Sequence, residues 1–291
     1  MDAYRGEPVL NLQGALAMLA TLLIWVGFLL SLRAEGQSPL TGTDLALMRF
    51  GLPALLFLPW LLRRRARLGA IRWRYGAMLM LGGLPFFYLV SLGSGYAPAA
   101  HAGALVPGTA PLFVTGLAVL VFKEPLPRKR LLGLAVILLG VLVLLGSALL
   151  DLQQGYWRGH LAFLGASLLW ACYTLGLRVI GIGALEATAL LCSGSLLGLG
   201  LLLAFGLVES NLNATPWVAI WPFLLAQGLG AGVIGGFTYG VAIRQLGAEK
   251  TAALGSFTPA LAALAAIPLL GESLALSGMI AVLVIMLGVA P

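Results

Sequence analysis

The chain has 291 residues, of which 60% are hydrophobic and only 9% are charged, and its mean hydropathy is +1.03. Soluble globular domains contain about 25% charged and 45–50% apolar residues, so this composition excludes a soluble domain and predicts a membrane protein. The formal net charge of +7 does not indicate nucleic-acid binding, because ten of the 17 Lys and Arg residues lie in two short loops, at residues 63–74 and 123–130.

Ten stretches of the chain are almost free of charge, and each approaches the ~20 residues that cross a ~30 Å hydrocarbon layer as a helix. They cover residues 10–32, 43–62, 74–93, 98–122, 130–150, 159–181, 185–207, 217–243, 248–270 and 275–290. We therefore predict an all-α integral membrane protein with ten transmembrane helices. The first stretch is too long for a signal-peptide core and lacks a small-residue cleavage site, so we expect it to remain in the protein.

The first predicted helix is echoed by the sixth, 145 positions later. Trp25 and Arg33 correspond to Trp170 and Arg178, and nine of the 20 positions from 14 to 33 are identical to their partners. Such self-similarity at a fixed offset is the sequence pattern of an internal repeat.

The second predicted helix carries a charge inside the membrane. It follows Thr43-Asp44, a plausible helix N-cap, and places Arg49 about two turns in. A charge at this depth costs from ~2.5 kcal/mol upward unless it is paired or wetted. Arg49 is therefore a candidate contact for a substrate or a gate; snorkelling to the surface or capping of a neighbouring helix is the alternative.

Helix breakers and small residues gather in four of the predicted helices. They are Gly82-Gly83 and Pro85 in the third, Pro107 and Pro111 in the fourth, Gly228, Gly232 and Gly236 in the eighth, and Pro259 in the ninth. Backbone groups that proline frees at membrane depth must be buried in protein or line a wet cavity. We expect these four helices, with the first and sixth, to surround a central cavity, and the fourth to be broken at its prolines.

A second echo, at an offset of 148, joins residues 103–141 to 251–289, with ten of 39 positions identical. It pairs Pro111 with Pro259, Glu124 with Glu272, and Gly140 with Gly288. We therefore predict two five-helix repeats, residues 1–152 and 153–291, in one transmembrane domain. Because five is odd, the second repeat enters the membrane from the opposite side, as in inverted-repeat transporters.

The loop charges predict the orientation. Basic residues follow the second and fourth helices of the first repeat, whereas the corresponding loops of the second repeat carry Glu209 and Glu272 and no Lys or Arg. The positive-inside rule then places both termini in the cytoplasm of a cell with this protein in its plasma (bacterial inner) membrane.

These signatures resemble the EamA family of the drug/metabolite transporter superfamily. The residues that carry the resemblance are Trp25 and Trp170, Arg49 with Phe50, Pro111 and Pro259, Glu124 and Glu272, and Gly140 and Gly288. The resemblance implies ten helices in two inverted repeats and export of small metabolites by alternating access. Family members include exporters of amino acids, among them aromatic ones, although the third helix here has less polar character than in some of these.

The charged residues restrict the cargo. Every acidic residue lies in a predicted loop or near a predicted helix end, and the spans contain no cluster of Lys and Arg that would hold a phosphate. A neutral or zwitterionic cargo is therefore expected, and the family resemblance implies an amino acid above other metabolites.

Aromatic side chains are the predicted cavity lining, because they suit an amphipathic molecule and hold ammonium groups by cation–π contact. The candidate substrate-binding residues are Trp25, Tyr88, Tyr96, Trp170, Tyr173, Phe237, Tyr239 and Phe257, together with Arg49 and His101. The repeated turns at Glu124 and Glu272 either cap the following helices or act as gates, with Pro111 and Pro259 as structural positions.

Other functions remain open. An exporter of amphipathic cationic drugs or of nucleosides is the main alternative, a channel is another, and an intramembrane enzyme built on Ser94 and His101 is remote, since no third orienting group is evident.

Cys172 and Cys192 lack metal-ligand spacing, so no metal or cofactor is expected. The expected partners are a small-molecule substrate and the lipid bilayer, with no nucleic acid, and the protein is expected to be a monomer or a weak homodimer.

Overall fold

The computed structural model describes residues 12–63, 71–150, 152–180, 182–246, 251, 254–255, 257–272 and 276–289. The chain ends, most of the first basic loop (64–70) and the Ser273-Leu274 part of the second repeated turn lie outside these residues. All regular structure in the described part is helical. Eight of its helical stretches are long and apolar enough to cross a membrane, and two shorter apolar helices, Thr258–Leu270 and Gly278–Val289, follow them.

The first half contains α1 (Leu12–Ala34), α2 (Gly42–Arg63), α4 (Trp73–Leu81), α5 (Leu84–Tyr96), α6 (Ala99–Phe122) and α7 (Arg128–Leu150). The second half contains α8 (Tyr156–Ile180), α9 (Ala184–Ala204), α10 (Trp217–Phe223), the π-helix η4 (Leu224–Ile234), α11 (Gly235–Leu246), α13 (Thr258–Leu270) and α14 (Leu276–Val289). Single 3₁₀ turns, η1 (Glu35–Gln37), η2 (Leu152–Gln154) and η3 (Leu212–Ala214), lie in the connections.

The third predicted span is two helices that meet at Gly82-Gly83. The N–H of Leu84 begins α5 without a helical acceptor, and it donates to the hydroxyl of Ser195 on α9 at 3.1 Å. A Cβ on Gly82 would lie 2.5 Å from the ring of Tyr173, so glycine makes room for an aromatic side chain of α8. The break is therefore buried in protein, as backbone freed inside a membrane must be.

The fourth span differs from the prediction, because α6 runs unbroken through Pro107 and Pro111. Neighbouring side chains hold its backbone. The hydroxyl of Ser167 on α8 donates to the carbonyl of Val106 at 2.9 Å and accepts from Thr109 at 2.8 Å. Pro107 and Pro111 free the carbonyls of Gly103 and Pro107, so the hydrogen bond to Val106 supports the helix beside the prolines but does not replace the two bonds that they remove.

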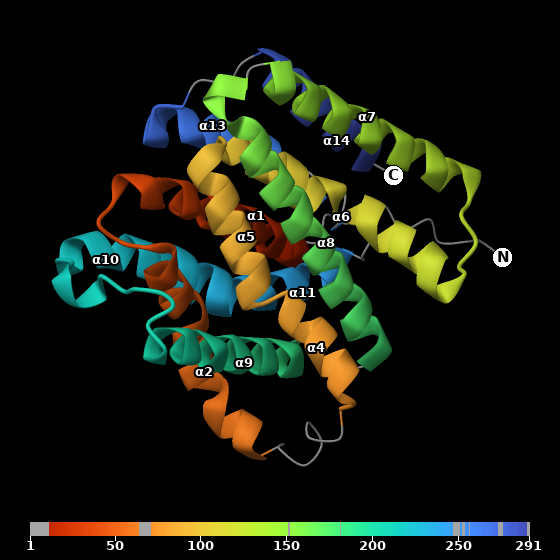
Figure 1. Cartoon of the computed structure of the whole chain (residues 1–291). Helices are drawn as coiled ribbons and strands as arrows, with labels where there is room; N and C mark the ends of the chain where they lie inside the picture. The colour runs from red at the N-terminus through yellow and green to blue at the C-terminus, as the bar shows by residue number, and fades with distance from the viewer. Residues whose placement is uncertain are drawn as a thin grey trace.

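The two halves pack on each other in a matched pattern. The helix α1 lies along η4 and α11 of the second half, and α8 lies along α4 and α5 of the first. Other close pairs are α2 with α9, α2 with η4, α6 with α8, α6 with α13, and α7 with α14. In Figure 1, α1 passes through the middle of the molecule, the α7–α14 pair lies at the top and the α2–α9 pair at the bottom. Helices that correspond in the two halves thus take corresponding partners.

Glycines allow the helices α7 and α14 to approach each other closely. A Cβ on Gly140 would lie 3.0 Å from the backbone nitrogen of Ile285, and one on Gly288 would lie 2.7 Å from that of Ile137. In lipid, helices associate through such close packing because burial of apolar surface gives little drive. The repeated glycines therefore have a direct structural role.

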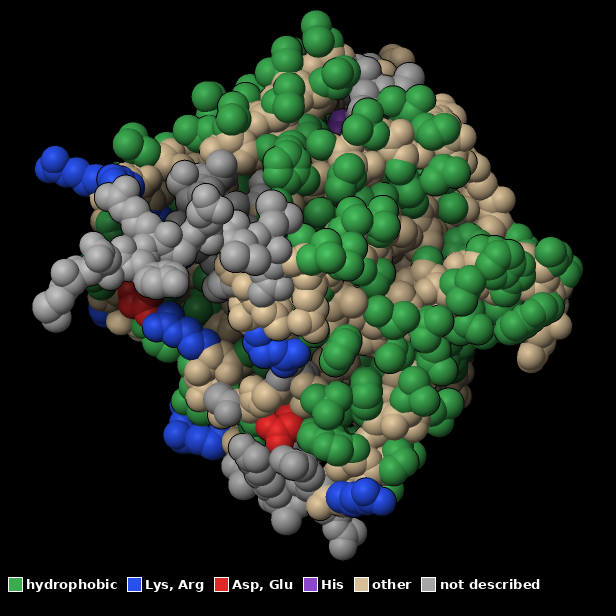
Figure 2. Space-filling model, turned by 180° about the vertical axis from the view of Figure 1, so that it is seen from behind, with side chains coloured by type: hydrophobic (Ala, Val, Ile, Leu, Met, Phe, Trp, Pro, Cys, Tyr) green, Lys and Arg blue, Asp and Glu red, His purple; other side chains and the backbone are tan. Residues whose placement is uncertain are grey.

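The exterior is apolar. Figure 2 shows hydrophobic side chains spread over the back face, with Lys and Arg side chains mainly toward its left and lower margins. Large leucines are strongly exposed, among them Leu150 at 92% and Leu120 at 69%. A surface of this kind suits a lipid environment and not water.

Candidate functional site

One end of the molecule is joined by an ion pair between Arg33 and Glu272. The Nε of Arg33 donates to Glu272 Oε1 at 2.6 Å, and its Nη1 donates to the carbonyl of Ser94 at 2.8 Å. The second carboxylate oxygen of Glu272 accepts from the N–H of Ala99 at 3.1 Å. The two side chains are 30% and 9% exposed. This contact links α1, α5, the start of α6 and the end of α13.

Asp44 closes a neighbouring junction at the start of α2. Its carboxylate accepts from Thr41, from the hydroxyl of Ser210 at 2.6 Å and from the N–H of Asn211 at 3.1 Å. The side chain is completely buried. Asp44 therefore ties the loop after α1 to the loop after α9 and has no oxygen left free.

The equivalent ion pair lies at the other end of α6, between Arg178 and Glu124. The side chains are 59% and 34% exposed. The Arg178 guanidinium also lies 5.7 Å from the ring centroid of Phe122. Because α6 has 24 residues and rises 1.5 Å per residue, its ends lie about 36 Å apart, so the two ion pairs occupy opposite ends of the bundle.

The two repeated tryptophans each contact an aromatic ring on a span of the other half. Trp170 lies 5.1 Å from Phe86 and 5.2 Å from Tyr173 between ring centroids. Trp25 lies 5.1 Å from Tyr239. The sequence prediction missed Phe86, although its place just after Gly82-Gly83 and Pro85 is a signal for it.

The other predicted aromatic residues do not join these groups. Tyr88 shares a hydrogen bond of 3.2 Å with Thr43. Tyr96 lies under Arg158 at 5.7 Å, near the start of α8. Phe237 and Phe257 are 70% and 51% exposed. The structure thus divides the eight predicted aromatic residues into two groups, around Trp170 and Trp25, and four side chains that belong to neither group.

Arg49 sits among side chains from several helices. Its guanidinium lies 5.7 Å from the ring centroid of Phe28 on α1 and 5.9 Å from that of Phe50 on α2. Tyr173 on α8 and Cys192 on α9 are close enough to interact with it electrostatically. We name these five residues the Arg49 cluster. The sequence prediction contained Arg49 and Tyr173 but not Phe28 or Cys192, because contacts between helices leave no trace in spacing.

His101 is paired with the second histidine of the chain. Its Nδ1 lies 3.0 Å from Nε2 of His160, and both side chains are buried. Tyr156 packs edge-on against His101 at 5.9 Å. The hydroxyl of Ser94 is buried without a hydrogen-bond partner, so the described residues contain no hydrogen bond between Ser94 and a histidine.

The predicted structural prolines lie on facing helices. Pro111 is inside α6 and Pro259 is buried in the first turn of α13, where a Cβ on Gly103 would lie 2.8 Å from the Cα of Pro259. The small residue at position 103 thus allows α6 and α13 to touch. Within the described part of the chain, no three His, Cys, Asp or Glu side chains are grouped to hold a metal ion.

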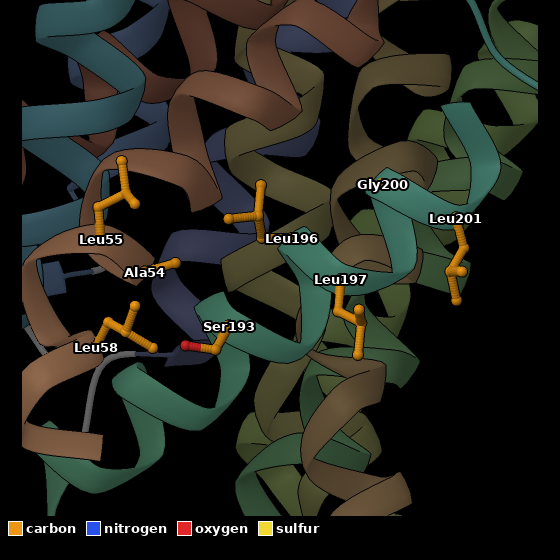
Figure 3. A pocket seen from close by; sticks show the side chains of 8 residues that line it. All are labelled: Ala54, Leu55, Leu58, Ser193, Leu196, Leu197, Gly200 and Leu201. Carbon is orange, nitrogen blue, oxygen red and sulfur yellow. The ribbon is translucent and has the colours of Figure 1, made fainter. Parts of the chain in front are cut away.

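An apolar groove of about 390 Å³ lies between α2 and α9 (Figure 3). Its lining consists of Ala54, Leu55, Leu58, Ser193, Leu196, Leu197, Gly200 and Leu201. Ser193 supplies the single polar side chain in this lining, and Leu55 and Leu197 are 67% and 68% exposed. The groove contains none of the predicted site residues and belongs to the lipid-facing exterior.

Comparisons with known proteins agree with this architecture. The model of the EamA-like transporter family matches residues 12–146 and again residues 157–290. The Bacillus subtilis (strain 168) protein "Uncharacterized transporter YoaV" is 28% identical over 197 residues, which is 65% of this chain and 64% of that protein. A crystal structure of another protein, at 20% identity, superposes with a TM-score of 0.60 over 96% of both chains and supports the fold alone.

The two family matches together cover nearly all of the chain, and the apolar helices agree with a multi-pass membrane protein. The chain belongs to the EamA-like transporter family.

Proposed function

We propose that this protein is a secondary transporter that exports small neutral or zwitterionic metabolites, most of all amino acids, by alternating access. In this proposal its ten spans form two inverted repeats, residues 1–152 and 153–291, with both termini on the cytoplasmic side of the plasma membrane. The matched packing of the two halves and the two separate family matches support the repeats. The shorter helices α13 and α14 supply the ninth and tenth spans.

The observation that carries the alternating-access proposal is the pair of ion contacts at opposite ends. Arg33 and Arg178 occupy corresponding repeat positions, and so do Glu272 and Glu124. Each contact joins an arginine at the end of one repeat's first helix to the turn after the other repeat's fourth helix. A carrier that opens to one side at a time must be able to close at each end. In an inverted repeat the same contact forms once from each half, and the two copies lie at opposite ends.

The two closures differ in strength, which supports a state closed at the Arg33 end. Glu272 is 9% exposed and accepts a second hydrogen bond from Ala99, whereas Glu124 is 34% exposed. With both termini cytoplasmic, the Arg33 end is the outer one. The described conformation is then closed to the outside and held more weakly toward the cytoplasm.

The cargo proposal rests on the polar groups inside the bundle. Asp44, Glu35, Glu272 and Glu124 all lie at helix ends and accept hydrogen bonds or pair with arginine there. No carboxylate of the described spans is left at the centre for a cation. Aromatic groups around Trp25 and Trp170 suit the apolar part of an amphipathic molecule.

Counterflow into proteoliposomes tests the proposal. Purified protein is reconstituted, the vesicles are loaded with an unlabelled compound, and uptake of the labelled compound is followed for amino acids, nucleosides and amphipathic cations. Saturable counterflow of an amino acid is the expected result. Counterflow of nucleosides or cationic drugs alone would show that the proposed cargo class is wrong. Unitary currents without counterflow would show that the protein is a channel and not a carrier.

A further inference from the structure

Arg49 is a charge inside the bundle without an anion beside it. It lies seven positions after the start of α2, and the other described Lys and Arg residues lie in loops or in the terminal turns of helices. Its neighbours Phe28, Tyr173 and Cys192 belong to three other helices. The side chain therefore points into the bundle, which excludes snorkelling along the lipid face.

Arg49 also has no helix to cap. Its guanidinium makes no hydrogen bond or ion pair in the described structure; it lies over the rings of Phe28 and Phe50, with Tyr173 and Cys192 within electrostatic range. A guanidinium carries five N–H donors in a planar fork. A ring face attracts the cation but leaves these donors without the oxygen acceptors that they match.

Two acidic residues of the described part of the chain are committed elsewhere. Asp44, on the same helix, is saturated by Thr41, Ser210 and Asn211. Glu272 is held by Arg33 and by the N–H of Ala99. A rearrangement that pairs Arg49 with either of these two carboxylates would therefore have to break its present contacts.

The neighbourhood of Arg49 combines a free carbonyl with aromatic side chains. The side chain retains partial exposure although helices surround it. Pro53 carries no N–H, so the carbonyl of Arg49 lacks its helical donor; Gly232 of η4 approaches that carbonyl, and a Cβ there would lie 3.0 Å from it. Tyr173 continues the cluster to Trp170 and Phe86, which form an aromatic wall.

We propose that Arg49 binds the carboxylate of the cargo, with both oxygens accepting from the guanidinium fork, and that Phe28, Tyr173 and Trp170 contact its apolar part. The cargo class is then a small monocarboxylate with an apolar side chain, α-amino acids included. The other described Lys and Arg residues lie in loops or terminal turns, so the second negative charge of a dicarboxylate or a phosphate ester would have no cation beside it. This inference rests on the proposed transport function and deepens it by naming the recognised group.

Thermal unfolding of the purified protein in detergent tests the site without transport. The probes are L-leucine, L-leucinamide, L-phenylalanine and L-phenylalaninamide, which differ within each pair only in the carboxylate. The wild type should be stabilised by the acids with an affinity about ten- to hundredfold above that for the amides, the range of charged hydrogen bonds. The Arg49→Gln variant should bind acid and amide alike, at the weaker level.

Two variants control for folding. Arg49→Lys keeps the charge but not the bidentate fork, so it should preserve the preference for acids at reduced affinity even if Arg49→Gln fails to fold. Arg63→Gln, at the exposed end of the same helix, should change nothing. Equal binding of acids and amides by the wild type, absence of binding by all four probes, or loss of the preference in Arg63→Gln would overturn the proposal.

Counterflow with the same proteins separates this inference from the transport proposal. If the protein carries out counterflow of amines or nucleosides, and Arg49→Gln leaves it unchanged, the transport proposal stands and the carboxylate site is refuted. If the acids bind in an Arg49-dependent way but no acid shows counterflow, the carboxylate site stands and the transport proposal is refuted.

Discussion

The Glu272→Gln variant should open the Arg33 end of the protein. Glutamine keeps an oxygen for the N–H of Ala99 but removes the charge that faces Arg33. Breaking a fully buried ion pair costs about 3–5 kcal/mol, but Arg33 is 30% exposed, so water replaces part of the lost contact. We take about 1.4 kcal/mol, which also matches the difference between a charged and a neutral hydrogen bond. That free energy corresponds to about a tenfold larger open population.

A cysteine below the ion pair measures this population. Ser94 suits the purpose, because its carbonyl accepts from Arg33 and its hydroxyl is buried without a partner. In a Ser94→Cys protein with Cys172 and Cys192 replaced by alanine, a soluble maleimide should label about ten times faster when Glu272→Gln is added. Purified protein in detergent exposes both ends, so the assay does not depend on orientation.

The Glu124→Gln variant is the matched control at the opposite end. Its ion pair is 59% and 34% exposed, and exposed pairs contribute only about 0–1 kcal/mol, so labelling of the Ser94→Cys protein should stay near the starting rate. Equal rates with and without Glu272→Gln, or an equal acceleration by Glu124→Gln, would refute the view that the Arg33–Glu272 contact holds this end closed.

Three further predictions concern packing, the broken span and the aromatic wall. Gly288→Ala should lower the free energy of unfolding by about 1–3 kcal/mol, because its Cβ overlaps the backbone of α7, whereas Gly146→Ala, with open space around it, should be neutral or stabilising in thermal unfolding. Ser195→Ala should cost about 1–3 kcal/mol by leaving the first N–H of α5 buried without an acceptor; Ser193→Ala, whose hydroxyl has no partner, should cost less. Trp170→Ala should lower counterflow several-fold, about 1 kcal/mol of lost stacking, with the amount of folded protein in membranes unchanged.

Each of these has an outcome that contradicts it. Equal unfolding temperatures for the two glycine variants would mean that α7 and α14 are not held as closely as described. If both serine variants lose the same free energy of unfolding, the hydrogen bond at the α4–α5 break does not contribute to stability. Unchanged counterflow of every accepted compound in Trp170→Ala would remove this residue from the cargo site.

Much of the fold was predictable because it depends on local composition. Long apolar runs marked the spans, and Gly82-Gly83 marked a real break, since a glycine pair before Pro85 weakens a helix whatever surrounds it. The prediction for Pro107 was wrong in its consequence. Whether a proline breaks a membrane helix depends on the groups packed around it, and the hydroxyl of Ser167, which holds the adjacent carbonyl of Val106, comes from a helix 61 positions away.

The candidate site was predictable in part, for a similar reason. Repeat positions singled out Trp25, Trp170 and Glu272 individually, but which side chains meet across the bundle depends on helix packing. Arg33 and Glu272 are separated by 239 positions, and neither spacing nor hydropathy joins them. The offset between the repeats carried the one usable signal, since it places a second arginine and a second glutamate in the same relation.

The unbroken course of α6 links the two ends of the protein mechanically. Its first residue holds Glu272 through a backbone N–H, and the turn after its last residue presents Glu124 to Arg178. A rigid helix that tilts about its centre moves its two ends in opposite directions. In the alternating access proposed above, a tilt of α6 would therefore loosen one of the two ion pairs while it keeps the other together.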